Sequence, residues 1–313
     1  MLNRRYLRIK VLQALYSFFH DEDKNIARSE KDLIKSIENI YDLYIYLLLL
    51  FKEIRVSVER LTEERKKKRL PTPEDINPNL SFVDNALLMK ISSSPDLARE
   101  KDKRKLGWTS EEDQLVKELY TKIVSSPEYA AYMADTERTY EKEKHFISVV
   151  YKKMLSENDS LKQHLFEKNI HWASDYVLAG ICIHKTLEAT TENEELALMP
   201  VYKADDDKDF MLELFRKTIL SDTENIELIS DKISNWEPDR IATMDFILMK
   251  LAITEVMNFK QIPVKVTLNE YIEISKLFSS PKSNTFINGI LDAIVKDLKK
   301  QNRVVKTGRG LLE

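Results

Sequence analysis

Apolar residues recur along this chain at steps of three and four, which is the spacing of one face of an α-helix. Residues 3–19 carry such a stripe through Leu7, Leu12 and Leu15. A longer stripe follows a capping sequence at Ser29 and continues to about residue 61. The pattern therefore predicts a helix over 3–19 and a long helix over 29–61.

The rest of the chain repeats this spacing in shorter segments. Helices are predicted near 109–124, 136–155, 159–168, 172–188, 207–219, 226–233, 236–256, 267–278 and 283–298. Residues 71–108 contain four prolines and a run of three serines, which favour a linker that holds at most a short helix over 82–91. We expect an N-terminal helical part (1–70), a partly helical insertion (71–170) with its Pro/Ser-rich linker, a C-terminal helical bundle (171–300) and a flexible tail (301–313).

Composition excludes several classes of site. The 313 residues include five glycines, and two of these, Gly308 and Gly310, lie near the end of the chain. Phosphate-binding loops and tight hairpins need clustered glycines, so neither is expected. The single cysteine, Cys182, lies in an apolar stretch and is interpreted as a buried thiol. The five histidines lack metal-binding spacing. We therefore expect no enzyme activity, no cofactor, no metal site and no small-molecule substrate.

Charge is balanced over the whole chain and uneven along it. There are 49 basic and 52 acidic residues, which gives a formal net charge of −3, so binding of a polyanion would need a local basic patch. Four cations crowd the start of the first helix: Arg4, Arg5, Arg8 and Lys10. The helix dipole disfavours cations there, so either an external anion or a solvated face would explain them. An acidic run at 205–209 is interpreted as the solvated start of another helix.

Membrane and export signals are weak in this sequence. The first residues are charged, and the longest apolar run, residues 43–51, is much shorter than the ~20 residues that span a bilayer. We expect a cytoplasmic protein without a membrane span.

Two segments carry recognisable motifs. The first is the arginine-rich start, which ends in Gln13-Ala14-Leu15-Tyr16. The second contains Glu255, the step Pro263-x-x-Val266-x-x-Asn269-Glu270 and the step Phe286-x-Asn288-Gly289-x-Leu291-Asp292. Together these motifs resemble the transcription antitermination factor NusB family, in which they occur in the same order. The resemblance implies an all-α, NusB-like bundle of helices in two helical subdomains, enlarged here by a helical insertion.

The resemblance also implies a function without catalysis. NusB-like proteins bind boxA-like single-stranded RNA of ribosomal RNA operon transcripts together with the small-subunit ribosomal protein NusE, within the RNA polymerase antitermination complex. Cations bind phosphates and aromatic rings stack on bases in such complexes. The candidate RNA-binding residues are Arg4, Arg5, Arg8, Lys10, Lys282, Ser283 and Phe286. Ser283 is interpreted as the cap of the last helix, with or without a phosphate contact, and Phe286 is either a stacking or a core residue.

Other motif residues are interpreted as scaffold: Gln13, Tyr16, Glu255, Pro263, Asn269, Glu270, Asn288 and Gly289. Glycine inside a helix costs about 1 kcal/mol relative to alanine, so Gly289 is expected at a close packing point. The alternative function is a helical protein–protein adaptor that keeps the fold and has lost RNA binding. The role of the insertion stays open, and we expect deletion of residues 75–165 to leave RNA binding largely intact.

Overall fold

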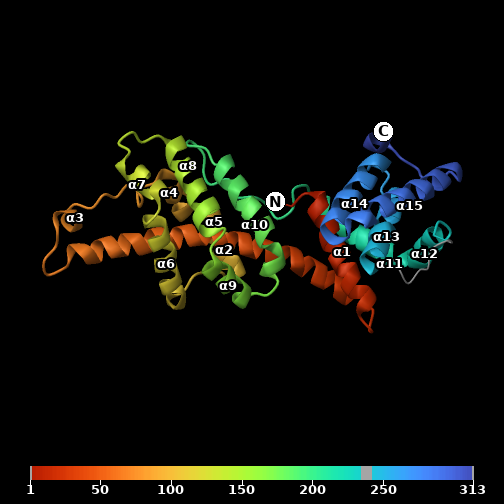
Figure 1. Ribbon diagram of the computed structural model, residues 1–313, viewed down its shortest axis with the longest axis horizontal. Coiled ribbons are helices and arrows are strands. Elements are labelled where there is room, and N and C mark those ends of the chain that lie inside the picture. The colour runs from red at the N-terminus through yellow and green to blue at the C-terminus, as the bar shows by residue number, and fades with distance from the viewer. Residues whose placement is uncertain (1, 234–241, 312–313) are drawn as a thin grey trace. The chain divides into compact units, whose positions relative to one another are not determined.

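The computed structural model describes residues 2–233 and 242–311, and its regular elements are helices (Figure 1). Within these ranges the β contact is a single bridge between Leu2 and Tyr202. The predicted all-α class is confirmed. The predicted helix start at 236–241 lies outside the described residues.

The chain divides into two compact units. Unit 1 combines Met1–Ser36 with Tyr202–Glu313, and unit 2 consists of Ile37–Val201. These limits differ from the expected boundaries at 70 and 170, because helix α2 (Ile26–Lys66) runs from one unit into the other. The N-terminal helix therefore belongs to the same unit as the C-terminal bundle.

Unit 1 is built around a buried central helix. Its helices are α1 (Arg4–His20), the start of α2, α11 (Asp207–Leu220), α12 (Asp222–Ser230), α13 (Thr243–Asn258), α14 (Val264–Phe278) and α15 (Pro281–Lys300). All residues of α13 from Ile247 to Val256 are buried, and α1, α11, α12, α14 and α15 pack against that helix. The predicted stripe of α1 is buried, and the side chain of Asn3 caps the helix by accepting a hydrogen bond from the Tyr6 N–H.

The described part of the C-terminal tail, residues 301–311, packs onto unit 1. After α15 it returns to the turn between α13 and α14, where the Thr307 N–H donates to the Lys260 carbonyl oxygen at 3.0 Å. It ends in a short 3₁₀ turn, Gly308–Leu311, in which Gly310 is buried. This differs from the flexible tail expected from the sequence.

Unit 2 surrounds the rest of α2. Its helices are α3 (Pro73–Ile76), α4 (Ala86–Ser93), α5 (Pro95–Arg104), α6 (Asp113–Val124), α7 (Pro127–Ala134), α8 (Tyr140–Val150), α9 (Asp159–Lys168) and α10 (Trp172–Ala189), with a 3₁₀ turn at Ser110–Glu112 and a π turn at Tyr151–Leu155. Every residue of the apolar run 43–51 is at most 2% exposed. Because an α-helix presents its residues in all directions, other elements must cover this part of α2 on every side. Cys182 on α10 is buried, and burial raises the pKa of its thiol to about 11.

The segment 71–108 is largely helical, unlike the expected linker. Two of its four prolines and one of its serines stand at helix starts: Thr72 caps α3 before Pro73, and Ser94 caps α5 before Pro95. Proline is tolerated at the first helical position because its missing N–H would be unpaired there in any case. Some of the residues that favoured a linker, namely Pro73, Ser94 and Pro95, are therefore signals of helix initiation.

Glu112 joins three parts of unit 2. It accepts hydrogen bonds from Lys168 on α9 at 2.6 Å, from Tyr46 on α2 at 3.1 Å and from the Thr109 hydroxyl at 2.6 Å. Burial on its own would raise the pKa of Glu112, but the hydrogen bonds from Lys168 and Thr109 outweigh it and lower the pKa to about 2.

This shift predicts acid sensitivity in unit 2. The folded pKa lies below the unfolded value of about 4.3, so the stabilisation is fully present above that pH and is lost as the pH falls towards 2. Glu112→Gln should lower the free energy of unfolding at pH 7 and flatten its pH dependence between about 4.5 and about 2.5. Urea titrations followed by Trp fluorescence at each pH measure both effects. An unchanged pH dependence in the variant would contradict this role.

Candidate nucleic-acid interface

A buried ion pair anchors the arginine-rich helix in unit 1. Arg8 on α1 is 3% exposed and Glu255 on α13 is 0% exposed. The Arg8 Nε and one terminal nitrogen donate to the two oxygens of Glu255 at 2.7 and 2.6 Å. The same carboxylate accepts from the hydroxyls of Thr267 at 2.8 Å and Tyr271 at 3.0 Å, both on α14. One carboxylate thus ties three helices together.

The surroundings keep the Arg8 guanidinium charged. Burial alone would lower the pKa of Arg8, but the charge and hydrogen bonds of Glu255 outweigh it and raise the pKa. Burial, followed by the charge of Glu255, raises the pKa of Tyr271 well above its usual value, so the phenol remains a donor. Because Arg8 is buried and bound on two nitrogens, we assign it to positioning α1 and not to contact with RNA.

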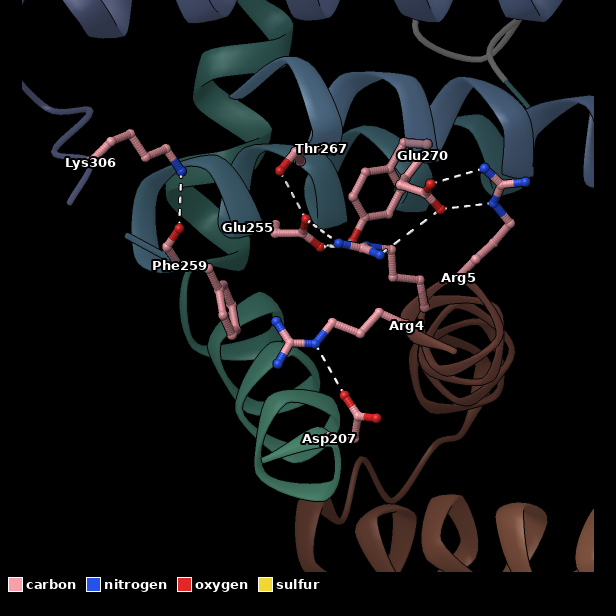
Figure 2. Close-up of polar contacts among 10 residues, drawn as sticks. Arg4, Arg5, Asp207, Glu255, Phe259, Thr267, Glu270 and Lys306 are labelled. Carbon is pink, nitrogen blue, oxygen red and sulfur yellow. Dashed lines mark hydrogen bonds and ion pairs between the residues drawn. The ribbon is translucent and has the colours of Figure 1, made fainter. Parts of the chain in front are cut away.

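Arg4 and Arg5 are more exposed than Arg8 and also bind carboxylates (Figure 2). Arg5 donates to both oxygens of Glu270 on α14, at 2.8 and 2.9 Å, and these hydrogen bonds raise the pKa of Arg5. Arg4 donates to Asp207 at 3.1 Å and to Asp206 at 2.7 Å. The exposed fractions of the Arg4 and Arg5 side chains are 34% and 41%.

The acidic run of the sequence therefore supplies the partners of Arg4. Asp206 and Asp207 come from the run that was interpreted as a solvated helix start, yet the Asp207 side chain is only 4% exposed and also accepts from the Ala204 N–H at 2.9 Å. The arginines need neither an external anion nor bulk water to balance their charge. Lys10, the fourth cation, is 6% exposed, so it does not form part of an open basic surface.

Two grooves meet at the start of α1. The first has a volume of about 990 Å³ and lies between α1, the start of α11 and the α13–α14 turn. The second, of about 560 Å³, is called the arginine groove here. Its charged lining residues are Arg4, Arg5, Arg8, Arg309 and Glu270, and its apolar ones are Ile262, Pro263 and Val266. Four arginines and one glutamate thus line this groove.

The remaining candidate RNA-binding residues stand at the start of α15. The interpretation of Ser283 as the helix cap is wrong, because Ser280 is the N-cap and its side chain accepts from the Ser283 N–H at 3.3 Å. Lys282 is exposed and Phe286 is half-buried. None of these three lines either groove in the described part of the chain. The structure brings together Arg4, Arg5 and Arg8 and places the α15 residues elsewhere.

The interpretation of Gly289 as a packing point is also wrong. The residue is exposed, and a Cβ added there would have no neighbour within 4 Å among the described residues. Asn269 and Asn288 are exposed as well. Tyr16 is 42% exposed and its ring lies against His20 of the same helix, with centroids 4.3 Å apart. It packs on its own helix instead of fixing α1 to the bundle through a buried contact.

Other motif residues do carry structural contacts. Pro263 immediately precedes α14 and Glu270 holds Arg5, while Gln13 is half-buried on α1. Sequence reasoning missed Thr267 and Tyr271 as partners of Glu255. Their spacing of four residues, on the helix that carries Glu270, places both on one face and is the signal that was available.

A family model described as the NusB family matches residues 177–296. The transcription antitermination protein NusB of Salinibacter ruber is 42% identical over 138 residues, which cover 42% of this chain and 86% of that protein. The chain belongs to the NusB family. The protein of the same name from Chloroherpeton thalassium is 39% identical over 106 residues, covering 34% of this chain and 50% of that relative. The transcription antitermination protein NusB of Natranaerobius thermophilus is 39% identical over 89 residues, which cover 27% of this chain and 64% of that protein.

Membership of the NusB family indicates a transcription antitermination factor. The family match includes α13, α14 and most of α15, and it leaves out residues 1–176 and the C-terminal tail. No solved structure matches the chain. In the described ranges, no helix is long and apolar enough to cross a membrane, and no group of three or more His, Cys, Asp or Glu side chains is arranged to hold a metal ion.

Proposed function

We propose that this NusB-family chain binds boxA-like single-stranded RNA of ribosomal RNA operon transcripts, with the ribosomal protein NusE as its partner in the antitermination complex. The RNA-binding surface in this proposal is the arginine groove. The observation that carries it is the set of four arginines that line one groove at the start of α1. Arg4 and Arg5 are the phosphate-binding residues, and Arg8 is their support.

The ion pairs of Arg4 and Arg5 are compatible with phosphate binding. A guanidinium has five N–H donors, and each of these two arginines uses two nitrogens on carboxylates. The remaining donors can bind a phosphate oxygen, and the carboxylates hold each side chain in one orientation, which reduces the entropy lost on binding. Apolar atoms of Ile262 and Val266 in the same wall offer a surface to an unstacked base.

The test is a titration of a boxA-like RNA oligonucleotide with the full chain at several salt concentrations. Replacing both Arg4 and Arg5 by Gln should weaken binding by about tenfold or more at physiological salt, since charge-assisted hydrogen bonds contribute about 1.5–3 kcal/mol each. The slope of log K against log salt should fall by about 0.7 for each phosphate that the variant no longer neutralises. Addition of NusE should tighten binding by the wild-type chain.

A matched control is Arg28→Gln with Lys31→Gln. Both residues are exposed on the part of α2 that belongs to unit 1, and neither lines a groove. This pair changes the net charge by the same amount as the double variant, so it should leave affinity and salt slope nearly unchanged. Equal behaviour of the two double variants would show that the start of α1 is not the RNA site.

One observation favours a second candidate function, a helical protein–protein adaptor. Arg4, Arg5 and Arg8 each have a carboxylate partner within the chain, so their charges are explained without RNA. An adaptor would bind NusE and would not discriminate boxA-like RNA from a scrambled oligonucleotide. Parallel titrations with the two RNAs and with NusE alone separate the two functions.

A further inference from the structure

The C-terminal tail is fixed against the turn between α13 and α14, whose residues Phe259 and Lys260 line the larger groove. The Lys306 ammonium donates to the Phe259 carbonyl oxygen at 3.1 Å, as Figure 2 shows, and the Thr307 N–H donates to the Lys260 carbonyl oxygen at 3.0 Å. Gly310 approaches the same turn so closely that a Cβ there would collide with the Lys260 carbonyl group. These contacts set the position of the residue between them, Arg309.

Arg309 is the charged residue of the tail that lines both grooves. It is exposed, and in the described residues it forms no ion pair with a carboxylate. Arg4, Arg5 and Arg8, in contrast, are each neutralised by a carboxylate. The uncompensated positive charge of the arginine groove therefore comes from the tail. An anion entering that groove would meet the strongest attraction at Arg309.

We propose that the C-terminal tail is part of the RNA-binding surface, and that Arg309 binds a phosphodiester group of single-stranded RNA beside Arg4 and Arg5. The inference rests on the function proposed above and adds a determinant from outside the region matched by the family model, which ends at residue 296. A fixed 3₁₀ turn presents the guanidinium without the entropy cost of ordering a free tail. The tail thereby adds a fourth arginine to the lining that α1 and α14 provide.

Two variants of the full chain test this role in different ways. Arg309→Gln removes the charge and keeps the docking contacts. Gly310→Ala keeps the charge and displaces the turn, because the added methyl group has no room beside Lys260. Each should weaken boxA-like RNA binding by about tenfold, and Arg309→Gln should lower the salt slope by about 0.7. Faster amide exchange at Thr307 in Gly310→Ala would report the displaced tail.

The control is Lys300→Gln, which makes the same change in net charge at a residue whose side chain is 79% exposed and lines neither groove. It should bind RNA with wild-type affinity and slope. If Arg309→Gln binds like the wild type while the Arg4/Arg5 double variant is weakened, the tail is not part of the site and the proposed function stands. If the wild-type chain shows no salt-dependent preference for boxA-like RNA, the proposed function fails and this inference fails with it.

Discussion

Replacing Glu255 by Gln is expected to destabilise unit 1 by about 3–5 kcal/mol, because the change leaves the Arg8 guanidinium buried without a counter-charge. The neutral amide also turns one acceptor into a donor, and it faces the hydroxyls of Thr267 and Tyr271. Urea denaturation followed by circular dichroism measures the destabilisation. A decrease in the free energy of unfolding below about 1 kcal/mol would show that the Arg8–Glu255 ion pair does not hold α1 in place as its geometry indicates.

Two further variants distinguish the electrostatic contribution of the Arg8–Glu255 ion pair from the contribution of side-chain packing. Replacing Arg8 and Glu255 together by Met removes both charges and keeps apolar volume, so it should recover most of the stability that the single variant lacks. Tyr271→Phe removes one hydrogen bond to the carboxylate and should cost about 1 kcal/mol. If the double variant is as unstable as Glu255→Gln, the destabilisation comes from packing and not from an uncompensated charge.

The spacing of apolar residues predicted most of the longer helices, but it missed α3, α5 and α7. The stripe of α1 predicted a helix over 3–19, and the structure has Arg4–His20. Spacing tells which face of a helix is buried, but it does not tell which distant segment covers that face. The partnership of Arg4 with Asp207, 203 residues further along the chain, could not be read from periodicity for this reason.

The charged residues of the candidate site also have distant partners that the sequence does not reveal. Four cations at the start of a helix were correctly identified as unusual, since the dipole disfavours them. For the three arginines the explanation is internal: Glu255, Glu270 and Asp207 lie on helices that pack against α1 and supply the missing negative charge. A sequence contains charged residues of both signs without showing which of them are close enough to pair. Arg309 was missed because tails are usually poorly ordered.

The wrong prediction of Ser283 as the cap of α15 comes from local sequence signals. Ser280 and Pro281 form a strong helix-start signal, with a capping side chain followed by proline at the first position. The apolar stripe, however, becomes visible only near Phe286, and this favoured Ser283 as the cap. The prolines of residues 71–108 were misinterpreted for a related reason, since a proline after a capping residue begins a helix as readily as it marks a linker.

The insertion also proves to be part of a core, which changes what its removal should do. Residues 43–51 of α2 are covered by segments between 71 and 170, as contacts at Tyr46 show: Trp108 stacks on its ring at 4.5 Å, and the Trp108 N–H donates to its carbonyl oxygen at 3.1 Å. Deleting 75–165 would return large apolar side chains to water, at roughly 1.5–3 kcal/mol each. We therefore expect the deletion to unfold unit 2, with a weaker helical signal and increased binding of a hydrophobic dye.

A pair of single substitutions keeps this prediction testable if the deletion variant aggregates. Leu88 and Met89 are neighbours on α4, with exposed fractions of 1% and 42%. Leu88→Ala should cost about 2–5 kcal/mol in unfolding free energy, since it leaves a cavity in the core of unit 2. Met89→Ala should change it by about 0.5 kcal/mol or less. Equal, small effects at both positions would mean that the insertion is not structurally required. Because all residues lining the two grooves belong to unit 1, the RNA titration on Leu88→Ala then asks a separate question, namely whether the α1 site works without a stable unit 2.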